Sequence, residues 1–339
     1  MMIPGGDKSH DLSGQDSEIA SGEFRSDPLN VHLYITPLCN LKCFHCYYDA
    51  RTLGDATGEM LSTSDIAFIV GSLTNHYEAD IHMEGGEPFL RTDLASIMDL
   101  VPDPCWSAVT ITTGGVAPIT IGGDRLRKFG DVRVSLEGHT DAMQRQIRGI
   151  DLGRVLATCH QLEADGVAVT IRITLHRMNI ACVPDMLSFF LDCGHSRFSL
   201  FELQPVGRGR RLDDLFLRES DLASALDDLA RLPPDPRLRS LKLSLPLGRV
   251  PLVERSAERL RQVGYDIRAM GGVPSLTINS DGEMGCSAWN ITSDGPADRI
   301  GMFRREDFAE QVWLLVRGGS LSLPCRFSSE ISIRYSRKP

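Results

Sequence analysis

From about residue 30 onward the sequence alternates between strand-like and helix-like segments, and this alternation constrains the fold more than any other feature. "NVHLYIT" (30–36) alternates in polarity and is rich in β-forming residues, and the helical pattern of "STSDIAFIVGSLTNHY" (62–77) follows it. Similar pairs recur up to the strand "RFSLFELQP" (197–205), which makes six βα repeats. Repeated βα units imply a parallel sheet or barrel with helices outside.

Local signals support the helix boundaries within this alternation. Ser62 and Asp65 have the spacing of a capping box at the start of the first helix. Gly166 ends the amphipathic helix predicted over 151–166. In folds of this kind, functional side chains collect where strands end and loops begin. The loops after the predicted strands are therefore where we expect the chemistry.

The chain divides into three expected segments. Residues 1–29 are polar and rich in Gly, Ser and Asp, which predicts a flexible N-terminal segment. Residues 30–235 contain the βα series, with a break at "PPDP" near its end. Residues 236–339 are expected to form a smaller α+β unit, in which "SLTINSDGEMGC" (275–286) predicts a hairpin that turns at 280–282.

Composition excludes several classes of protein. A formal net charge of −9 argues against non-specific binding to nucleic acid. No apolar run is long enough to span a bilayer, and the N-terminus lacks the pattern of a signal peptide. The nine cysteines are odd in number and unevenly spaced, so they do not suggest a secreted disulfide framework. We expect a cytoplasmic protein with reduced thiols.

Three of the cysteines lie within eight positions of one another, in "CNLKCFHCYY" (39–48). Thiolates at the spacing of Cys39, Cys43 and Cys46 can converge on one metal site if the loop folds around it. Structural zinc ions and iron–sulfur clusters are usually held by four ligands, but the next cysteine is Cys105. Three ligands on a four-iron cluster leave one iron open to a small molecule, as a catalytic site requires.

The C-x3-C-x2-C spacing after the first strand, with "EGGEP" (84–88) after the second, resembles the radical S-adenosylmethionine (SAM) superfamily. The resemblance covers roughly residues 30–210. It implies an α/β fold, a partial (β/α)6 barrel with a small α+β C-terminal cap. It also implies that Cys39, Cys43 and Cys46 ligate a [4Fe–4S] cluster that binds SAM. One electron would cleave SAM to methionine and a 5′-deoxyadenosyl radical, which abstracts a substrate hydrogen.

The resemblance also implies roles in SAM binding. Gly85, Gly86 and Glu87 would bind its amino group, through backbone carbonyls and the Glu87 side chain. Two adjacent glycines let the backbone approach a ligand closely. Ser135 and Glu137, at the end of the fourth predicted strand, would lie at the ribose.

Further positions resemble the carboxylate and adenine contacts of the family. Arg148 would pair with the SAM carboxylate, a task that suits a bidentate guanidinium; the alternative is a solvated arginine at a helix end. His45 would contact adenine through its backbone. The remaining adenine-side positions are Thr174, Asn179 and Leu203 to Pro205.

Two features outside these motifs leave alternatives open. "GRGRR" (207–211) would meet an anion, or is a solvated basic loop. Cys286 and Cys325 lie in a tail that resembles a SPASM or twitch domain with fewer cysteines than either. They would ligate an auxiliary iron–sulfur cluster, or Cys286 would donate a hydrogen atom to a substrate radical, or both are core residues.

The resemblance implies a substrate from one of two classes, a precursor peptide or a small molecule such as a sugar, aminoglycoside or nucleoside. It also implies an electron donor of the flavodoxin or ferredoxin type. A different class of function is a non-catalytic scaffold that binds metal. In that hypothesis the cysteines form a zinc knuckle with His45 or His32 as fourth ligand.

Overall fold

The computed structural model describes residues 28–55, 58, 60–232, 235–286, 299–316 and 328–335, so Cys325 and the expected N-terminal segment up to residue 27 lie outside the described residues. The strands are β1 (Pro28–Tyr34), β2 (Leu38–Cys39), β3 (Arg51–Thr52), β4 (Glu78–Glu84), β5 (Val109–Thr113), β6 (Asp131–Ser135), β7 (Val169–Leu175), β8 (Arg197–Glu202), β9 (Ser240–Pro246), β10 (Tyr265–Val273), β11 (Ser275–Ile278), β12 (Glu283–Gly285), β13 (Arg299–Met302) and β14 (Ser328–Tyr335). The helices are α2 (Thr63–His76), α3 (Leu94–Asp99), α4 (Gly123–Leu126), α5 (Asp141–Arg148), α6 (Leu152–Ala164), α7 (Val183–Asp192), α8 (Glu219–Arg231), α9 (Val250–Gln262) and α10 (Phe308–Val316).

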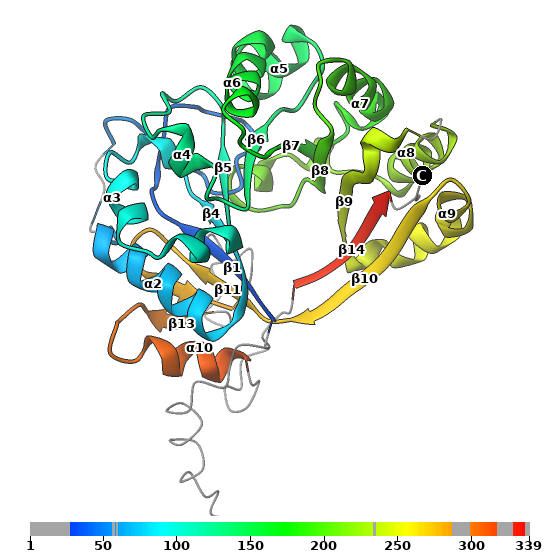
Figure 1. Ribbon diagram of the computed structural model, residues 1–339. Coiled ribbons are helices and arrows are strands. Elements are labelled where there is room, and N and C mark those ends of the chain that lie inside the picture. Colours follow the sequence, from blue (N-terminus) through cyan, green and yellow to red (C-terminus); the bar gives the residue numbers. More distant parts are fainter. Residues whose placement is uncertain are drawn as a thin grey trace, which may run out of the picture.

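The centre of the molecule is a curved parallel sheet with helices outside it (Figure 1). Strands β1, β4, β5, β6, β7, β8 and β9 pair in that order, all in parallel. The predicted α/β fold with a partial barrel is therefore confirmed. The series continues further than the sequence pattern indicated, because α8 leads into β9 as another parallel strand beyond residue 235.

The alternation along each strand separates the core from the barrel interior. On β7, Val169, Ile171 and Ile173 are buried in the hydrophobic core, between the sheet and the helices. Arg172 and Thr174 alternate with them and line a pocket. Burial of each aliphatic side chain contributes about 1.5–3 kcal/mol, so the outer face holds the barrel together. The inner face is thereby left to polar side chains.

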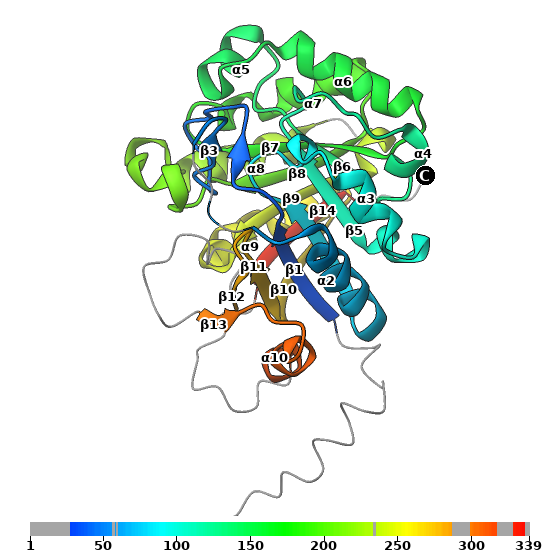
Figure 2. The ribbon, with the colours of Figure 1, turned by 90° about the vertical axis from the view of Figure 1, so that its left-hand side faces the viewer.

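The C-terminal segment belongs to the same sheet. β14 pairs antiparallel with both β9 and β10, while β11 pairs parallel with β1 (Figure 2). Only Pro274 separates β10 from β11, and its carbonyl accepts a hydrogen bond from Asn30 N–H at 3.0 Å. The tail therefore joins the two ends of the parallel series across the open side of the barrel.

The predicted local signals are present. Ser62 Oγ accepts from the Asp65 N–H at 3.1 Å, and the Asp65 carboxylate accepts from the Ser62 N–H at 3.2 Å, which completes a capping box. The predicted hairpin forms between β11 and β12, with Gly282 at φ +87° in its turn. None of the helices in the described ranges is long and apolar enough to cross a membrane.

Candidate active site

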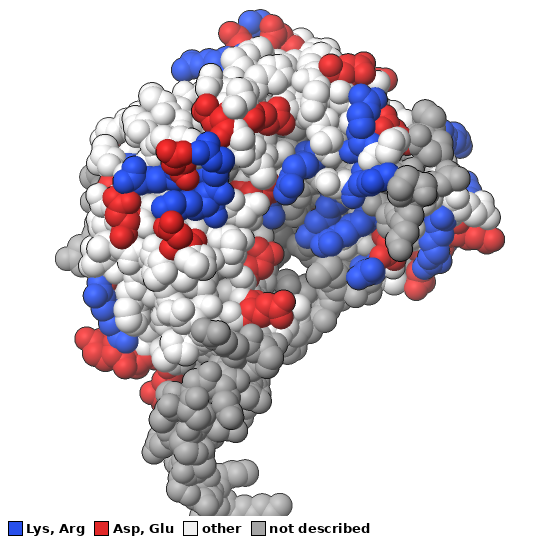
Figure 3. All heavy atoms as spheres, viewed as in Figure 1, with Lys and Arg blue, Asp and Glu red and all other residues white. Residues whose placement is uncertain are grey.

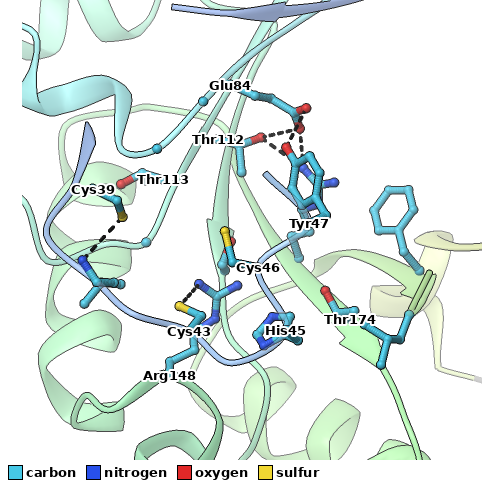
Figure 4. A pocket seen from close by; sticks show the side chains of 18 of the residues that line it. Cys39, Cys43, His45, Cys46, Tyr47, Glu84, Thr112, Thr113, Arg148 and Thr174 are labelled. Carbon is cyan, nitrogen blue, oxygen red and sulfur yellow. Dashed lines mark hydrogen bonds and ion pairs between the residues drawn. The ribbon is translucent and has the colours of Figure 1, made fainter. Parts of the chain in front are cut away.

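The three clustered cysteines line one pocket at the carboxyl ends of the parallel strands (Figure 4). The pocket encloses about 920 Å³ of empty space, part of it open to solvent. Cys39 and Cys43 are buried and Cys46 is partly exposed. The loop turns tightly, because Cys46 N–H donates to the Cys43 carbonyl at 3.3 Å. Leu41 N–H donates to Cys39 Sγ at 3.3 Å, which directs that thiol toward the loop.

The two glycines after β4 pack directly against the first residues of the cysteine loop. Gly86 N–H donates to the Thr36 carbonyl at 2.7 Å, and Glu87 N–H donates to the Leu38 carbonyl at 2.8 Å. Gly85 has φ +141°, a conformation that favours glycine. A Cβ on Gly86 would lie 2.0 Å from the Leu38 carbonyl oxygen. Both glycines line the pocket, so the predicted close backbone approach is available to a ligand.

The Glu87 carboxylate has a different place from the one the resemblance implied. It is fully buried and does not line the pocket. It accepts hydrogen bonds from the Thr113 hydroxyl at 2.9 Å and from the Gly114 N–H at 2.8 Å. Burial raises its pKa, and these donors partly offset that effect. In this arrangement Glu87 ties the end of β4 to the end of β5, and any contact with a ligand would be left to the backbone.

A buried carboxylate also organises the opposite side of the pocket. Glu137 accepts from Arg148 Nη2 at 2.7 Å and from Thr174 N–H at 2.6 Å, and lies 3.3 Å from His45 Nε2. Burial would raise its pKa, but the charges of Arg148 and His45 outweigh burial and hold that pKa at about 2. Glu137 itself does not line the pocket, whereas Ser135 does. Glu137 therefore positions side chains that reach the pocket.

Arg148 connects this carboxylate to the cysteines. Its Nη1 lies 3.5 Å from Cys43 Sγ (Figure 4). Its Nε and Nη2 donate to Glu137. Its pKa is raised by Cys43 and Glu137, although burial acts in the opposite direction. The alternative of a solvated helix-end arginine is thus wrong, since this side chain is buried at the pocket wall.

The other predicted positions divide into those at the pocket and those away from it. His45, Thr174 and Leu203 line the pocket. Asn179 is buried behind it, and its side-chain amide donates to the backbone carbonyls of Glu137 and Thr174. Asn179 therefore supports two strand ends without lining the pocket.

The basic loop after β8 holds the cysteine loop from outside. Arg208 N–H donates to the Cys46 carbonyl at 2.9 Å, and its guanidinium donates to the Ala50 carbonyl at 3.1 Å and pairs with Asp49 at 3.2 Å. A Cβ on Gly207 would lie 2.2 Å from the Tyr47 carbonyl oxygen. Arg208 is therefore committed to the loop, and is neither simply solvated nor open to an anion.

Cys286 is fully buried in the hydrophobic core after β12. It is not among the residues that line the pocket. This placement corresponds to the core alternative, and it gives no support to hydrogen donation by Cys286. The auxiliary cluster stays a prediction, because its other proposed ligand, Cys325, is outside the described residues.

A family model described as the radical SAM superfamily matches residues 33–190, the segment that contains the cysteine loop, the two glycines and Arg148. This match identifies a radical SAM domain at residues 33–190. Solved structures of similar fold include SuiB of Streptococcus suis bound to its precursor peptide SuiA, with a TM-score of 0.64 at 13% identity, covering 94% of this chain and 74% of SuiB. Native anSMEcpe with bound AdoMet has a TM-score of 0.60 at 17% identity, covering 84% of this chain and 81% of that one.

Curated relatives match part of the chain. A probable GTP 3′,8-cyclase of Sulfurisphaera tokodaii is 27% identical over 185 residues, 53% of this chain and 58% of the relative. An Fe-coproporphyrin III synthase of Methanosarcina barkeri is 29% identical over 205 residues, 58% of this chain and 50% of the relative. The chain thus spans about half the length of the curated relatives it matches.

The three clustered thiols, to which both metal hypotheses assign a ligand role, are free cysteines. Among the described residues, no group of three or more His, Cys, Asp or Glu side chains is placed to hold a metal ion. Both histidines of the zinc-knuckle alternative contact a buried carboxylate, His45 with Glu137 and His32 with Glu84.

Burial disfavours the ionised form of two of the three clustered thiols. Burial raises the pKa of Cys39 to about 12. Burial also raises the pKa of Cys43, although the charge of Arg148 acts in the opposite direction. Thiols that resist ionisation in the protein become thiolates when iron coordinates them, because a metal-bound thiol is deprotonated.

Sequence reasoning missed a third buried carboxylate, Glu84, at the pocket floor. Glu84 accepts from the Tyr47 hydroxyl at 2.9 Å, pairs with His32 at 3.2 Å, and forms an ion pair with Arg172. The Arg172 guanidinium lies over the Phe201 ring, 4.8 Å from its centroid. The sequence signal for this pair was a charged residue in each of two β-forming segments, Glu84 at the end of β4 and Arg172 inside β7. That signal has little value until the barrel brings the strands together.

Proposed function

We propose that this protein is a radical SAM enzyme in which Cys39, Cys43 and Cys46 hold a [4Fe–4S] cluster beside bound SAM. The chemistry that these cofactors supply is one-electron cleavage of SAM to methionine and a 5′-deoxyadenosyl radical, which abstracts a hydrogen atom from the substrate. The observation that carries the proposal is the convergence of three thiols on one pocket that the backbone of Gly85 and Gly86 also lines.

The chain's own residues would bind and orient SAM. Gly85 and Gly86 present backbone at the pocket, and Ser135 and Thr174 lie at the ends of β6 and β7. Arg148 is held by Glu137 so that its guanidinium faces the cysteines, where it would attract the SAM carboxylate. The surrounding barrel would keep water from the reacting atoms.

We further propose that the substrate is a peptide or another natural-product precursor, and that a flavodoxin- or ferredoxin-type protein would supply the electron to the cluster in the cytoplasm. Support for a peptide comes from fold alone, since SuiB is described as bound to a precursor peptide and anSMEcpe as bound to peptides. The alternative is a sugar, aminoglycoside or nucleoside, and the relatives named for a reaction of GTP favour it. A third reading is a non-catalytic metal-binding scaffold.

The test is iron and sulfide per chain after anaerobic reconstitution, together with 5′-deoxyadenosine formed from SAM and a reductant. A variant with Cys39→Ala, Cys43→Ala and Cys46→Ala should lose cluster and cleavage. Cys182→Ala, outside the pocket, should keep both. If the wild-type protein binds zinc, or carries a full cluster and cleaves no SAM, the scaffold hypothesis replaces the enzyme hypothesis. Iron retained in the triple variant would reveal an auxiliary cluster.

A further inference from the structure

The charged side chains that line the cysteine pocket are paired with opposite charges. Apart from cysteine and histidine, the lining includes two arginines and two glutamates. The ion pairs are Arg148–Glu137, Arg172–Glu84 and Arg249–Glu202. The carboxylates of all three pairs are buried. Within the described part of the chain, the pocket wall therefore offers no unpaired cation or carboxylate to a ligand.

The Glu84–Arg172 pair at the pocket floor is held from several sides. Glu84 also accepts hydrogen bonds from the Tyr47 hydroxyl at 2.9 Å and from the Thr112 hydroxyl at 3.4 Å. The Arg172 guanidinium covers the Phe201 ring. A charged ligand would have to separate the two members of the pair, and a buried charge without its partner is strongly destabilising. The floor is therefore unfavourable for a ligand group with a net charge.

A second cavity, with about 1580 Å³ of empty space and partly open to solvent, lies at the amino ends of the parallel strands. It shares Glu84, Arg172 and Phe201 with the cysteine pocket, so the two spaces meet at the floor. Its lining has as many carboxylates as cations, namely Glu78, Asp80, Glu84 and Asp131 with Arg133, Arg172, Arg197 and Lys242. Figure 3 shows side chains of both signs around the hollow in the middle of the molecule. A ligand that extends below the floor thus meets balanced charges as well.

The remaining polar side chains of the cysteine pocket are uncharged. They are Tyr47, Thr112, Thr113, Ser135, Thr174 and Gln204. Gln204 follows β8 and donates from Nε2 to the Glu202 carbonyl at 3.2 Å, while its Oε1 has no partner among the described residues. Hydroxyl and amide groups both donate and accept hydrogen bonds, as the groups of a peptide or a sugar also do. The wall therefore matches a polar ligand without charge.

We propose that the cysteine pocket binds an uncharged polar group of the substrate, a peptide amide or a sugar hydroxyl, and excludes a phosphate or carboxylate. The SAM carboxylate would occupy Arg148, which leaves no cation for an anionic substrate. Burying an unpaired anion is costly, whereas an uncharged group exchanges its hydrogen bonds with water for those of the wall.

This selectivity separates the substrate classes that the proposed function leaves open. Peptides, sugars and nucleosides remain, whereas nucleotides are excluded, although curated relatives are named for a reaction of GTP. Calling the ligand a substrate rests on the proposed function. The preference for an uncharged ligand rests only on the charges that line the pocket.

Titration calorimetry on the reconstituted full chain, with excess SAM and no reductant, tests the preference. The uncharged probes are maltose and the tripeptide Ala-Gln-Ala, acetylated and amidated at its ends. Their anionic counterparts are maltose 1-phosphate and the equally capped Ala-Glu-Ala. We expect wild type to bind at least one uncharged probe, and the tighter of the two distinguishes an amide from a hydroxyl ligand. Its anionic counterpart should bind at least about tenfold more weakly.

Two variants give the pocket an unpaired cation. Glu84→Gln is nearly isosteric and leaves Arg172 without its carboxylate. Gln204→Lys places an ammonium group at a partly exposed position, where a replacement should not prevent folding. Each should bind the anionic probe at least about tenfold more tightly than wild type does. The matched control, Asp99→Asn, frees the exposed Arg125 on α4 and should stay within about twofold of wild type, since surface charges are screened.

The proposal is overturned if the anionic counterpart binds wild type as tightly as the uncharged probe, if neither uncharged probe binds, or if neither variant gains affinity for the anion. SAM cleavage is measured separately on the same preparations. A preference for uncharged probes without SAM cleavage would refute the proposed enzyme and keep the selectivity. SAM cleavage together with tight binding of the anionic probes would refute the selectivity alone.

Discussion

Gly86 lies so close to Leu38 that a Cβ added to it would stand 2.0 Å from the Leu38 carbonyl oxygen. The two sequence motifs of the candidate site are therefore one structural unit. The glycines after β4 hold the backbone that leads into Cys39, and Glu87 N–H donates to that same carbonyl at 2.8 Å. A substitution at either glycine should thus displace the cysteine loop first.

The first prediction is that Gly86→Ala loses most of its iron. The new methyl group would collide with backbone, which cannot rotate away as a side chain can, so the Cys39 end of the loop must shift. Iron and sulfide per chain after anaerobic reconstitution measure the effect. The control is Gly71→Ala on α2, where nothing lies within 4 Å; it should keep its iron and gain up to about 1 kcal/mol in unfolding free energy. Full iron in Gly86→Ala would contradict the coupling.

The second prediction concerns the buried pair Arg148–Glu137. Arg148→Met leaves a buried carboxylate without its guanidinium, and we expect a loss of about 3 kcal/mol in the unfolding free energy of the cluster-free protein. Adding Glu137→Gln should recover part of the loss, because no uncompensated charge remains. Denaturant unfolding of both variants measures the coupling. Arg145→Met, on the exposed side of α5, should leave stability nearly unchanged. If the losses in unfolding free energy from the two substitutions simply add, Arg148 and Glu137 do not stabilise one another.

The third prediction is a pH dependence set by Asp93. Hydrogen bonds from Arg91 lower the pKa of Asp93 to about 2, and that arginine also donates to the carbonyls of Ile35 and Leu61. Because the folded pKa lies below the unfolded value, the stabilisation is present above pH 4 and disappears as pH falls toward 2. After allowance for partial exposure we expect about 1 kcal/mol. Asp93→Asn should flatten this part of the stability profile; an unchanged slope between pH 5 and 2 would refute the assignment.

The fourth prediction is that Arg208→Ala exposes the cluster to air. Its guanidinium donates to the Ala50 carbonyl, and a charge-assisted bond of this kind contributes about 1.5 kcal/mol. The cysteine loop should then open about tenfold more often. The rate of bleaching at the cluster absorbance, followed after air is admitted, measures this opening. Arg231→Ala, an exposed arginine on α8, is the control and should bleach at the wild-type rate. Equal rates for both variants would show that Arg208 does not hold the loop.

Sequence reasoning located the cysteine loop, the glycines and the βα series correctly. It did not find which way the carboxylates at the end of β4 point. Glu87 is turned into the protein toward Thr113 and Gly114, and Glu84, three residues earlier, faces the pocket instead. The end of a strand permits either direction, and the choice depends on the donors that neighbouring strands supply.

The boundary at residue 235 shows a similar limit. The segment that follows it gave no clear pattern, yet β9 joins the parallel series and β11 pairs with β1. Pairing between strands so distant along the chain depends on the curvature of the whole sheet. Local periodicity carries no information about that curvature.

The sequence by itself determined the local features of this protein: the C-x3-C-x2-C spacing, the capping box at Ser62 and the alternation that builds a βα barrel. These are set by residues a few positions apart, which interact through local backbone geometry. The tertiary structure alone decided which charges meet. Arg172 reaches Glu84 across 88 positions, and Asp131 is shared by Arg133 and Arg197, because the curved sheet brings the inner faces of separate strands together. The charge pattern inside the barrel is therefore a property of the whole sheet, and no single segment of the chain contains it.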